Sequence, residues 1–349
     1  MGEIVVAATA FGDPRQLAYW ARPSPSRPRY TAAMIARPTR SDWLLLLALG
    51  IMWGTSYAFI KLGVETLPTF TLIAARLAIG LGFLMTVVLV AREPLPRSPR
   101  IYGHLAVMAA INIVIPFTLI TWAELSVDSA IAAILNGAVP LIVIVLAALT
   151  FHDEPITVNR LVGVVTGYVG VVVLIGPGIF TALSGESEFT GEIALLGSTV
   201  AYAIGSVYSR RNMRGLRPMI PAVFQVGFAF LMVSVLALVF ENPFAVAWNL
   251  DAVVAVLWLG LLGSGLAYLL MFRLLARIGA TATSQLAYLL PIVGIITGAI
   301  MFGEKVDAGV LIGTGLILAG VTLVNSKYGE RRLWGRHPAP TEPKGRTAS

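Results

Sequence analysis

The stretches 154-EPITVNRLVGVVTGYVG-170 and 304-EKVDAGVLIGTGLILAG-320 are two versions of one pattern. An offset of 150 residues superimposes a glutamate and two glycines, placing Glu154 on Glu304, Gly163 on Gly313 and Gly170 on Gly320. A proline precedes each glutamate by 14 or 13 residues, at Pro140 and Pro291. The chain therefore contains an internal repeat.

The stretch 53-WGTSYAFIK-61 belongs to the same repeat. An offset of 149 residues places Trp53 on Tyr202, Lys61 on Arg210 and Arg76 on Gln225. Aromatic and hydroxyl side chains thus recur near the middle of two apolar segments, although Trp and Tyr usually mark the membrane interfaces.

The composition indicates a helical membrane protein. Hydrophobic residues make up 57% of the chain and charged residues 12%, with a mean hydropathy of +0.83, whereas soluble domains are about 25% charged. The apolar runs are continuous rather than alternating, which argues against a β-barrel. The absence of cysteine excludes disulfides and thiol catalysis. The net charge of +7 is expected to set membrane topology rather than to bind nucleic acid.

Ten segments are long and apolar enough for a bilayer-spanning helix, which needs about 20 residues. They are 43–63, 68–91, 101–122, 128–150, 158–177, 191–210, 219–240, 252–272, 281–302 and 307–325. We therefore predict an all-α polytopic membrane protein with ten transmembrane helices in two five-helix repeats, 43–180 and 191–325.

The two ends of the chain have a different composition. Residues 1–42 are rich in Pro, Arg and Ser and are predicted to be a disordered basic arm, while residues 326–349 form a basic tail. Met34 stands directly before the first helix and is an alternative start, which leaves open whether residues 1–33 are translated.

Basic residues predict the orientation in the membrane. With the N-terminus in the cytoplasm, the outward loops hold only Lys61 and Lys305. The inward loops hold Arg92, Arg97, Arg100, Arg160, Arg210, Arg211, Arg214, Arg217, Arg273 and Arg277. The positive-inside rule therefore places both termini in the cytoplasm. Because five helices is an odd number, the second repeat enters the membrane inverted.

These features resemble the EamA family of the drug/metabolite transporter superfamily. The resemblance rests on 53-WGTSYAFIK-61, on 75-AR-76 and on the proline–glutamate–glycine runs of both halves, and it covers about residues 43–325. It implies a carrier of the bacterial inner (plasma) membrane, often an exporter of amino acids or related metabolites. It does not specify the substrate.

We predict a central substrate cavity between the two halves, as in other transporters with inverted repeats. Its candidate residues are Trp53, Tyr57, Arg76, Asn112, Asn136, Tyr202, Gln285 and Tyr288. Trp53 and Tyr57 share one helix face near mid-bilayer, and Tyr202 repeats that arrangement. Gln285 and Tyr288 are expected nearer the cytoplasmic side. Helix packing is the alternative role for the aromatic residues.

Three prolines inside apolar segments each free a backbone carbonyl four residues earlier. Pro116 frees that of Asn112, Pro140 that of Asn136 and Pro291 that of Ala287. Within a membrane, such groups are tolerated where neighbours or a water-filled cavity satisfy them. The two asparagine side chains favour a polar cavity, and a kink that only shapes the bundle is the alternative.

Arg76 is the charged residue that lies deepest in a predicted span. An unpaired charge at the centre of a bilayer costs about 2.5–3.5 kcal/mol, so a partner is expected. Glu124 or Asp128, at the outer end of the third segment, would supply a structural ion pair. The alternative is that Arg76 binds an anionic group such as a substrate carboxylate.

Glu154 and Glu304 each precede the last helix of a repeat. A carboxylate there stabilises the helix N-terminus through the macrodipole by about 0.3–1 kcal/mol. In the helices that follow, the glycine pairs 163/167 and 309/313 have the spacing that lets helices approach closely. Both features indicate structural support rather than coupling.

A membrane-embedded enzyme is the rival function. No His or Asp lies deep in a predicted span, no P-loop is present, and His152 beside Asp153 and Glu154 is weak evidence for a metal. We therefore expect no catalytic residue, cofactor or metal, and a monomer suffices for a carrier of a small metabolite. A channel is a further alternative, distinguished because a carrier saturates and shows counterflow.

Overall fold

The computed structural model describes residues 38–151, 156–182, 188–213, 216–217, 219–326 and 332–334. Most of the predicted N-terminal arm, most of the basic tail and the His152–Glu154 stretch lie outside the described residues. The described part is almost entirely helical, and its two short strands, β1 (Ile156–Thr157) and β2 (Arg332–Trp334), pair antiparallel.

Helices form in the first half at the predicted places. They are α3 (Arg40–Val64), α4 (Thr69–Ala91), α5 (Pro99–Ala109), the π-helical η1 (Ala110–Val114), α6 (Ile115–Ala123), α7 (Ser129–Gly137), α8 (Val139–Thr150) and α9 (Val158–Ala182). The first helix begins earlier than predicted because Thr39 and Asp42 form a capping box, in which each side chain binds the other's backbone N–H.

The second half repeats this order. Its helices are α10 (Glu188–Asn212), α11 (Met219–Phe240), α12 (Leu250–Leu257), the π-helical η2 (Trp258–Leu266), α13 (Ala267–Thr283), α14 (Leu286–Phe302) and α15 (Ala308–Asn325). Each half therefore has a π-helical segment in its third helix, at equivalent positions of the repeat.

Proline interrupts these helices in different ways. The segment 128–150 is divided at Ala138, because Pro140 cannot donate a backbone hydrogen bond in the first turn of α8. Pro116 is the second residue of α6, which begins where η1 ends. Pro291, in contrast, lies inside an unbroken α14.

The eighth predicted segment extends further than the sequence indicated. Regular helix continues from η2 through α13 to Ile278. Gly279, at a φ of 77°, then forms a kink, after which a short helical stretch extends to Thr283. Arg273 and Arg277 were expected in a loop, and this was wrong: both are helical. The helix continues because no proline and no other turn residue precedes Gly279 in this stretch.

Eight helices in the described part have the length and hydropathy needed to cross a membrane. The helix α14 is apolar but only 17 residues long. The helix α10 has 25 residues but is more polar, because it carries Glu192, several hydroxyl residues and a closing Arg210–Arg211 pair. It packs between α6 and α8, so part of its surface contacts protein rather than lipid.

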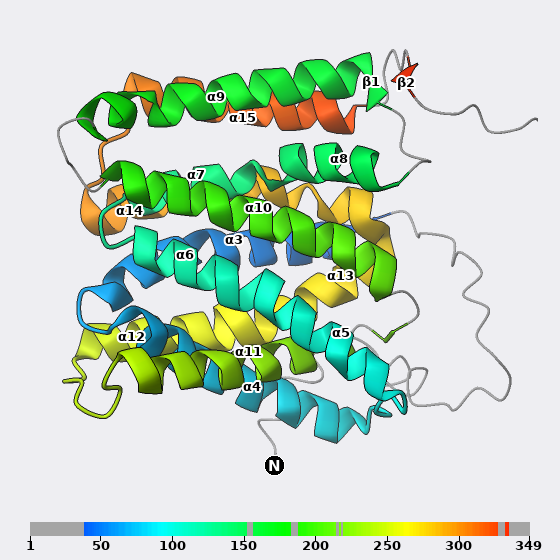
Figure 1. Ribbon diagram of the computed structural model, residues 1–349, viewed down its shortest axis with the longest axis vertical. Coiled ribbons are helices and arrows are strands. Elements are labelled where there is room, and N and C mark those ends of the chain that lie inside the picture. Colours follow the sequence, from blue (N-terminus) through cyan, green and yellow to red (C-terminus); the bar gives the residue numbers. More distant parts are fainter. Residues whose placement is uncertain are drawn as a thin grey trace, which may run out of the picture.

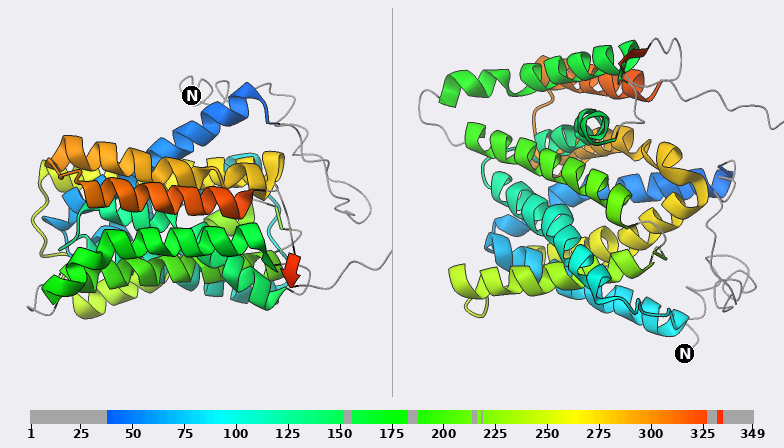
Figure 2. Two further views of the ribbon diagram at one scale, coloured as in Figure 1. Left: turned by 90° about the horizontal axis from the view of Figure 1, so that it is seen from above. Right: turned by 45° about the vertical axis from the view of Figure 1, so that its right-hand side comes forward.

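Equivalent helices of the two halves pack against each other in opposite directions. In the pair α9 and α15, Gly163 lies against Gly320, and Gly170 lies against Gly313. The start of one helix therefore meets the end of the other. Figure 1 and Figure 2 show this pair side by side at one edge of the bundle.

Two further pairs of equivalent helices, α7 with α14 and α4 with α11, also pack antiparallel. Gly137, at the end of α7, contacts Pro291 in the first half of α14. Glu241, which follows α11, accepts hydrogen bonds from the backbone N–H groups of Phe70 and Thr71 at the start of α4, at 2.8 Å each. The antiparallel contacts are those expected of an inverted repeat.

The outer surface of the bundle is apolar. Large aliphatic side chains are among its most exposed residues, including Val90 (75%), Leu149 (76%) and Ile300 (78%). Soluble proteins rarely expose so much contiguous apolar surface. The described helices therefore present a surface suited to a lipid bilayer.

Candidate functional site

Arg76 lies in the interior of the bundle, on α4, with a 3% exposed side chain. Tyr57 on α3, Tyr202 on α10 and Tyr268 on α13 are within electrostatic range of its guanidinium. We call Arg76, these three tyrosines and Trp53 the central cluster. Both halves of the chain contribute to it.

The guanidinium of Arg76 is held by neutral groups. Its Nε donates to Ser264 Oγ at 3.3 Å, and its Cζ lies 4.3 Å from the centre of the Phe117 ring. Such cation–π contacts contribute about 2 kcal/mol when water is excluded. The guanidinium also lies beside Gly263, where a Cβ would stand 3.0 Å from Ser56 Oγ and 3.4 Å from Arg76 Nη2.

The predicted ion pair between Arg76 and an acid was wrong. In the part of the chain that the structure describes, no carboxylate forms a salt bridge with Arg76. Asp128 pairs instead with Lys61, at 3.3 Å between Oδ1 and Nζ. Glu124 is within electrostatic range of Arg76 but forms no salt bridge with it. Within the described residues, the guanidinium of Arg76 therefore has its contacts with Ser264 and Phe117.

Trp53 faces the bundle rather than lipid. Its indole Nε1 donates to the carbonyl of Gly263 at 3.0 Å, and its ring meets that of Tyr268 edge to face, with centroids 6.0 Å apart. The π-helical η2 thus contacts Trp53 through the carbonyl of Gly263 and Arg76 through Ser264.

Tyr57 is buried, and Tyr202 is half-buried against the hydrophobic side chains of both halves. Asn112 lies in η1 against the backbone of Gly205, three residues beyond Tyr202. Asn136 is 4% exposed, and its amide is bound within the bundle: Nδ2 donates to Ala132 O at 3.1 Å and Oδ1 accepts from Ser198 Oγ at 3.4 Å.

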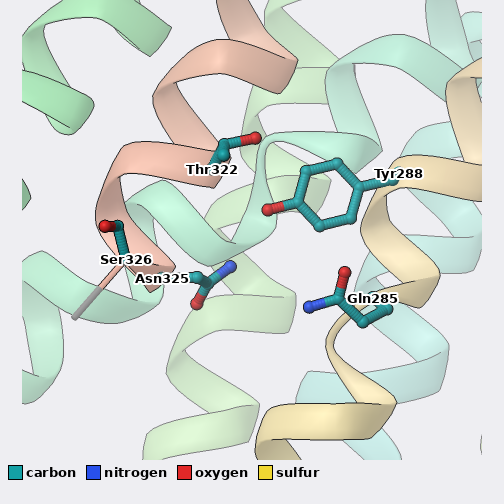
Figure 3. Close-up of a pocket in the computed structure, with 5 residues that line it drawn as sticks. All are labelled: Gln285, Tyr288, Thr322, Asn325 and Ser326. Carbon is teal, nitrogen blue, oxygen red and sulfur yellow. The ribbon is translucent and has the colours of Figure 1, made fainter. Parts of the chain in front are cut away.

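Gln285 and Tyr288 lie at the start of α14. With Thr322, Asn325 and Ser326 they line a cavity of about 420 Å³ between the start of α14 and the end of α15. Figure 3 shows the polar ends of Gln285, Tyr288 and Asn325 directed toward one another. A second cavity of about 320 Å³ adjoins Gln285 and Tyr288 on the side of α3. By the predicted topology both open toward the cytoplasm.

Sequence reasoning missed three residues of this site, Phe117, Ser264 and Tyr268. Tyr268 had a usable signal, since it is an aromatic residue with a polar end inside an apolar span. Ser264 stands between two glycines in 263-GSG-265, a small polar motif that could have been noticed. Phe117 had no signal, because a phenylalanine in an apolar segment indicates only packing.

Glu304 caps a helix, but a different one from that expected. Its carboxylate accepts from Ser129 N–H (2.8 Å), Ser129 Oγ (2.9 Å) and Ala130 N–H (3.0 Å) at the start of α7. Asp307 takes the expected role at α15, accepting from Val310 N–H at 2.8 Å. The prediction named the wrong helix because the chain turns after α14 and brings Glu304 back to α7.

The chain matches known membrane transporters in both halves. The sequence pattern of the EamA-like transporter family matches residues 41–176 and 189–326. The uncharacterized transporter YoaV of Bacillus subtilis is 21% identical over 288 residues, covering 82% of this chain and 98% of YoaV. The uncharacterized inner membrane transporter YedA of Escherichia coli K12 is 27% identical, covering 81% of this chain and 90% of YedA.

The architecture also occurs in a solved structure. A crystal structure of another protein superimposes with a TM-score of 0.60 at 19% sequence identity, covering 82% of this chain and 96% of that one. This likeness concerns the fold alone. It spans the same share of the chain as the sequence matches do.

Proposed function

The chain belongs to the EamA-like transporter family, and from that premise we propose that it carries a small amphipathic metabolite with a carboxylate group, such as an amino acid, across the plasma membrane. In this proposal it has ten spans in two inverted repeats and both termini in the cytoplasm. It works by alternating access, in the direction of export.

One observation carries the proposal. Arg76 is 3% exposed and forms no salt bridge in the described part of the chain. Uncompensated cations inside membranes are costly and usually mark substrate or ion pathways. The planar guanidinium presents donors that match a carboxylate in two parallel hydrogen bonds.

The surroundings of Arg76 suit an amphipathic ligand. Trp53, Tyr57, Tyr202 and Tyr268 offer large ring faces together with polar atoms, the combination typical of small-molecule sites. Asn112 and Asn136 lie on helices next to this cluster, and we include both in the proposed site. The cluster draws on α3, α4, α10 and α13, so a rocking of one half against the other would change its access.

The cavity at Gln285 and Tyr288 supports an inward-facing arrangement. Because it lies toward the predicted cytoplasmic side, it would serve as the entrance for an exported substrate. Its amide and hydroxyl groups suit a zwitterionic or carboxylate compound before that compound reaches Arg76.

The function is tested by counterflow in proteoliposomes. The probes are the radiolabelled apolar amino acids, each compared with its own carboxamide, which differs only at the carboxylate. We expect saturable counterflow of at least one amino acid and little of its carboxamide. Flux that neither saturates nor shows counterflow would indicate a channel, and no flux of any probe would contradict the proposed substrate class.

The site is tested with Trp53→Ala in the same assay. Because Trp53 forms part of the central cluster, we expect a sharp loss of counterflow in a protein that still inserts and elutes as a folded species. Trp122→Ala is the matched control, since Trp122 is 46% exposed on the outside of the bundle. Equal transport by the two variants would assign Trp53 to helix packing.

A further inference from the structure

Glu124 is a buried acidic residue that forms no salt bridge in the part of the chain that the structure describes. It directly follows α6 and is 1% exposed. Neither of its carboxylate oxygens accepts a well-formed hydrogen bond from the described residues, although the backbone N–H of Lys61 is close enough to act on the carboxyl group. Since a buried charge needs pairing or hydrogen bonds, such a group is stable chiefly as the neutral acid. A carboxyl group that gains and loses a proton inside a transporter is available for coupling.

The groups that face Glu124 connect it to the central cluster. Lys61 and Tyr57 act on it from α3, Arg76 from α4 and Glu304 from the segment before α15. Burial raises the pKa of Glu124 well above its ordinary value. Lys61 and Arg76 oppose that rise in pKa, while Glu304 adds to it.

Glu304 is a second carboxylate of this region, and hydrogen bonds occupy its oxygens. It accepts three hydrogen bonds from the start of α7, at 2.8–3.0 Å. These donors belong to the first turn of α7, so the Glu304 carboxylate serves as a cap of that helix. Lys61 connects the region to the outer surface, since its side chain is 22% exposed and lies 3.9 Å from Glu304.

We propose that Glu124 is the proton-binding site that links transport to proton movement, and that a carboxylate bound at Arg76 favours protonation of Glu124. The proposal rests on the transport function above. It adds the coupling ion, the residue that binds it and the sign of the coupling.

The sign follows from charge. With its site empty, the guanidinium of Arg76 stabilises the charged form of Glu124. A substrate carboxylate at Arg76 offsets that positive charge, so the affinity of Glu124 for a proton increases. By linkage, a proton on Glu124 increases the affinity for the substrate carboxylate by the same factor. One proton passes from water to the Glu124 carboxylate, and no covalent bond of the substrate changes. The proton and the substrate then cross the membrane together. Export down a substrate gradient then carries protons outward.

Protonation can be measured without a substrate. Infrared difference spectra of the purified full-length protein, recorded across a pH titration, should contain a protonated carboxylic acid band at neutral pH that disappears as the pH rises. We expect Glu124→Gln to remove this band. Glu65→Gln is the matched control, because Glu65 is an exposed carboxyl beyond the end of α3, and it should keep the band. A band that persists in Glu124→Gln overturns the assignment.

Arg76→Gln gives an independent measurement if Glu124→Gln does not fold. Loss of the cation should move the midpoint of the carboxylic acid band to higher pH, because the Arg76 charge no longer stabilises the charged form of Glu124. An unchanged midpoint overturns the link between the two residues.

Transport then separates this proposal from the function on which it rests. With the amino acid that gives the fastest counterflow, Glu124→Gln should retain counterflow, which needs no net proton movement, and lose accumulation driven by a pH gradient. Undiminished gradient-driven accumulation by Glu124→Gln overturns the proton role. Absence of counterflow in the wild type contradicts the transport function instead, while the infrared result still stands.

Discussion

Glu304 and Ser129 are 175 residues apart in sequence, and the carboxylate of Glu304 accepts both the backbone N–H and the hydroxyl of Ser129, at 2.8 and 2.9 Å. The contact joins the turn between α14 and α15, in the second half, to the start of α7 in the first half. It satisfies backbone donors that a helix N-terminus leaves unpaired.

Glu304→Gln should therefore lower stability and spare transport. Hydrogen bonds to charged groups contribute about 1.5–3 kcal/mol, and Gln keeps one acceptor, so we expect a loss of about 1–2 kcal/mol. Thermal unfolding of the purified protein measures it, with Glu65→Gln as the exposed control. Loss of counterflow at full folded yield would mean that Glu304 takes part in transport.

Arg76→Lys should reduce recognition of carboxylates selectively. The ammonium group of Lys keeps the charge but loses the planar fork that binds two carboxylate oxygens. We expect about a tenfold loss of apparent affinity, or about 1.4 kcal/mol, for an amino acid and a smaller change for its carboxamide. Competition counterflow measures both constants. Arg100→Lys, at an exposed arginine, should behave as wild type, and equal losses for acid and carboxamide would contradict carboxylate binding.

Gly320→Ala should destabilise the pair α9 and α15. A Cβ at Gly320 would stand 2.5 Å from Gly163 O and 2.6 Å from Gly167 N, and backbone atoms cannot swing aside. Overpacking of this kind costs about 1–3 kcal/mol. Gly315→Ala in the same helix is the control, because nothing lies within 4 Å of its added Cβ. Equal melting temperatures for the two variants would show that the helices do not meet at this seam.

The stability of the folded protein should decrease as the pH rises into the alkaline range, because of Glu124. Burial raises the pKa of Glu124 in the folded state. The folded state therefore holds its proton more tightly than the unfolded chain does. This contribution to stability is fully present below the unfolded-state pKa and is lost as the pH rises through the raised folded-state pKa. Melting temperatures from about pH 5 to about pH 9 should decline less in Glu124→Gln than in wild type. An equal decline of melting temperature with pH in Glu124→Gln and in wild type would exclude Glu124 as the cause.

The proposed orientation can be tested by reporter fusions. Fusions within residues 182–190 and 241–250 should be external, and fusions at 212–216 should be cytoplasmic. The expectation follows from the excess of arginine in the predicted inward loops. The opposite result would contradict the inverted repeat as well as the topology.

The sequence predicted the helices well because lipid imposes one simple requirement. Each segment must satisfy its own backbone hydrogen bonds and present apolar side chains. This requirement acts along the chain and can be recognised without knowing any contact. The helix α10 was predicted although it is more polar, and neighbouring helices bury its Ser198 and Thr199. The prediction was wrong at Arg273 and Arg277, where helix replaces the expected loop.

The candidate site was predicted in part. The sequence identified Trp53, Tyr57, Arg76 and Tyr202 through their unusual depth and their recurrence in the repeat, and the structure brings these residues together. It could not identify Phe117, which becomes important only because it lies 4.3 Å from the Arg76 guanidinium. A ring contact of this kind has no signature in a single segment.

The sequence by itself determined the class of protein, the repeat and the presence of a charge deep in a span, because composition and periodicity are properties of the chain alone. Tertiary structure alone decided the partners of each charge. Arg76 lies against Ser264 and Phe117 rather than an acid, Glu304 stabilises α7 rather than α15, and Glu124 is buried without a well-formed hydrogen bond to its carboxylate in the described part of the chain. The physical reason is that electrostatic and hydrogen-bond energies depend on distances of a few ångströms between residues far apart in the sequence, and only the packing of the helices sets those distances.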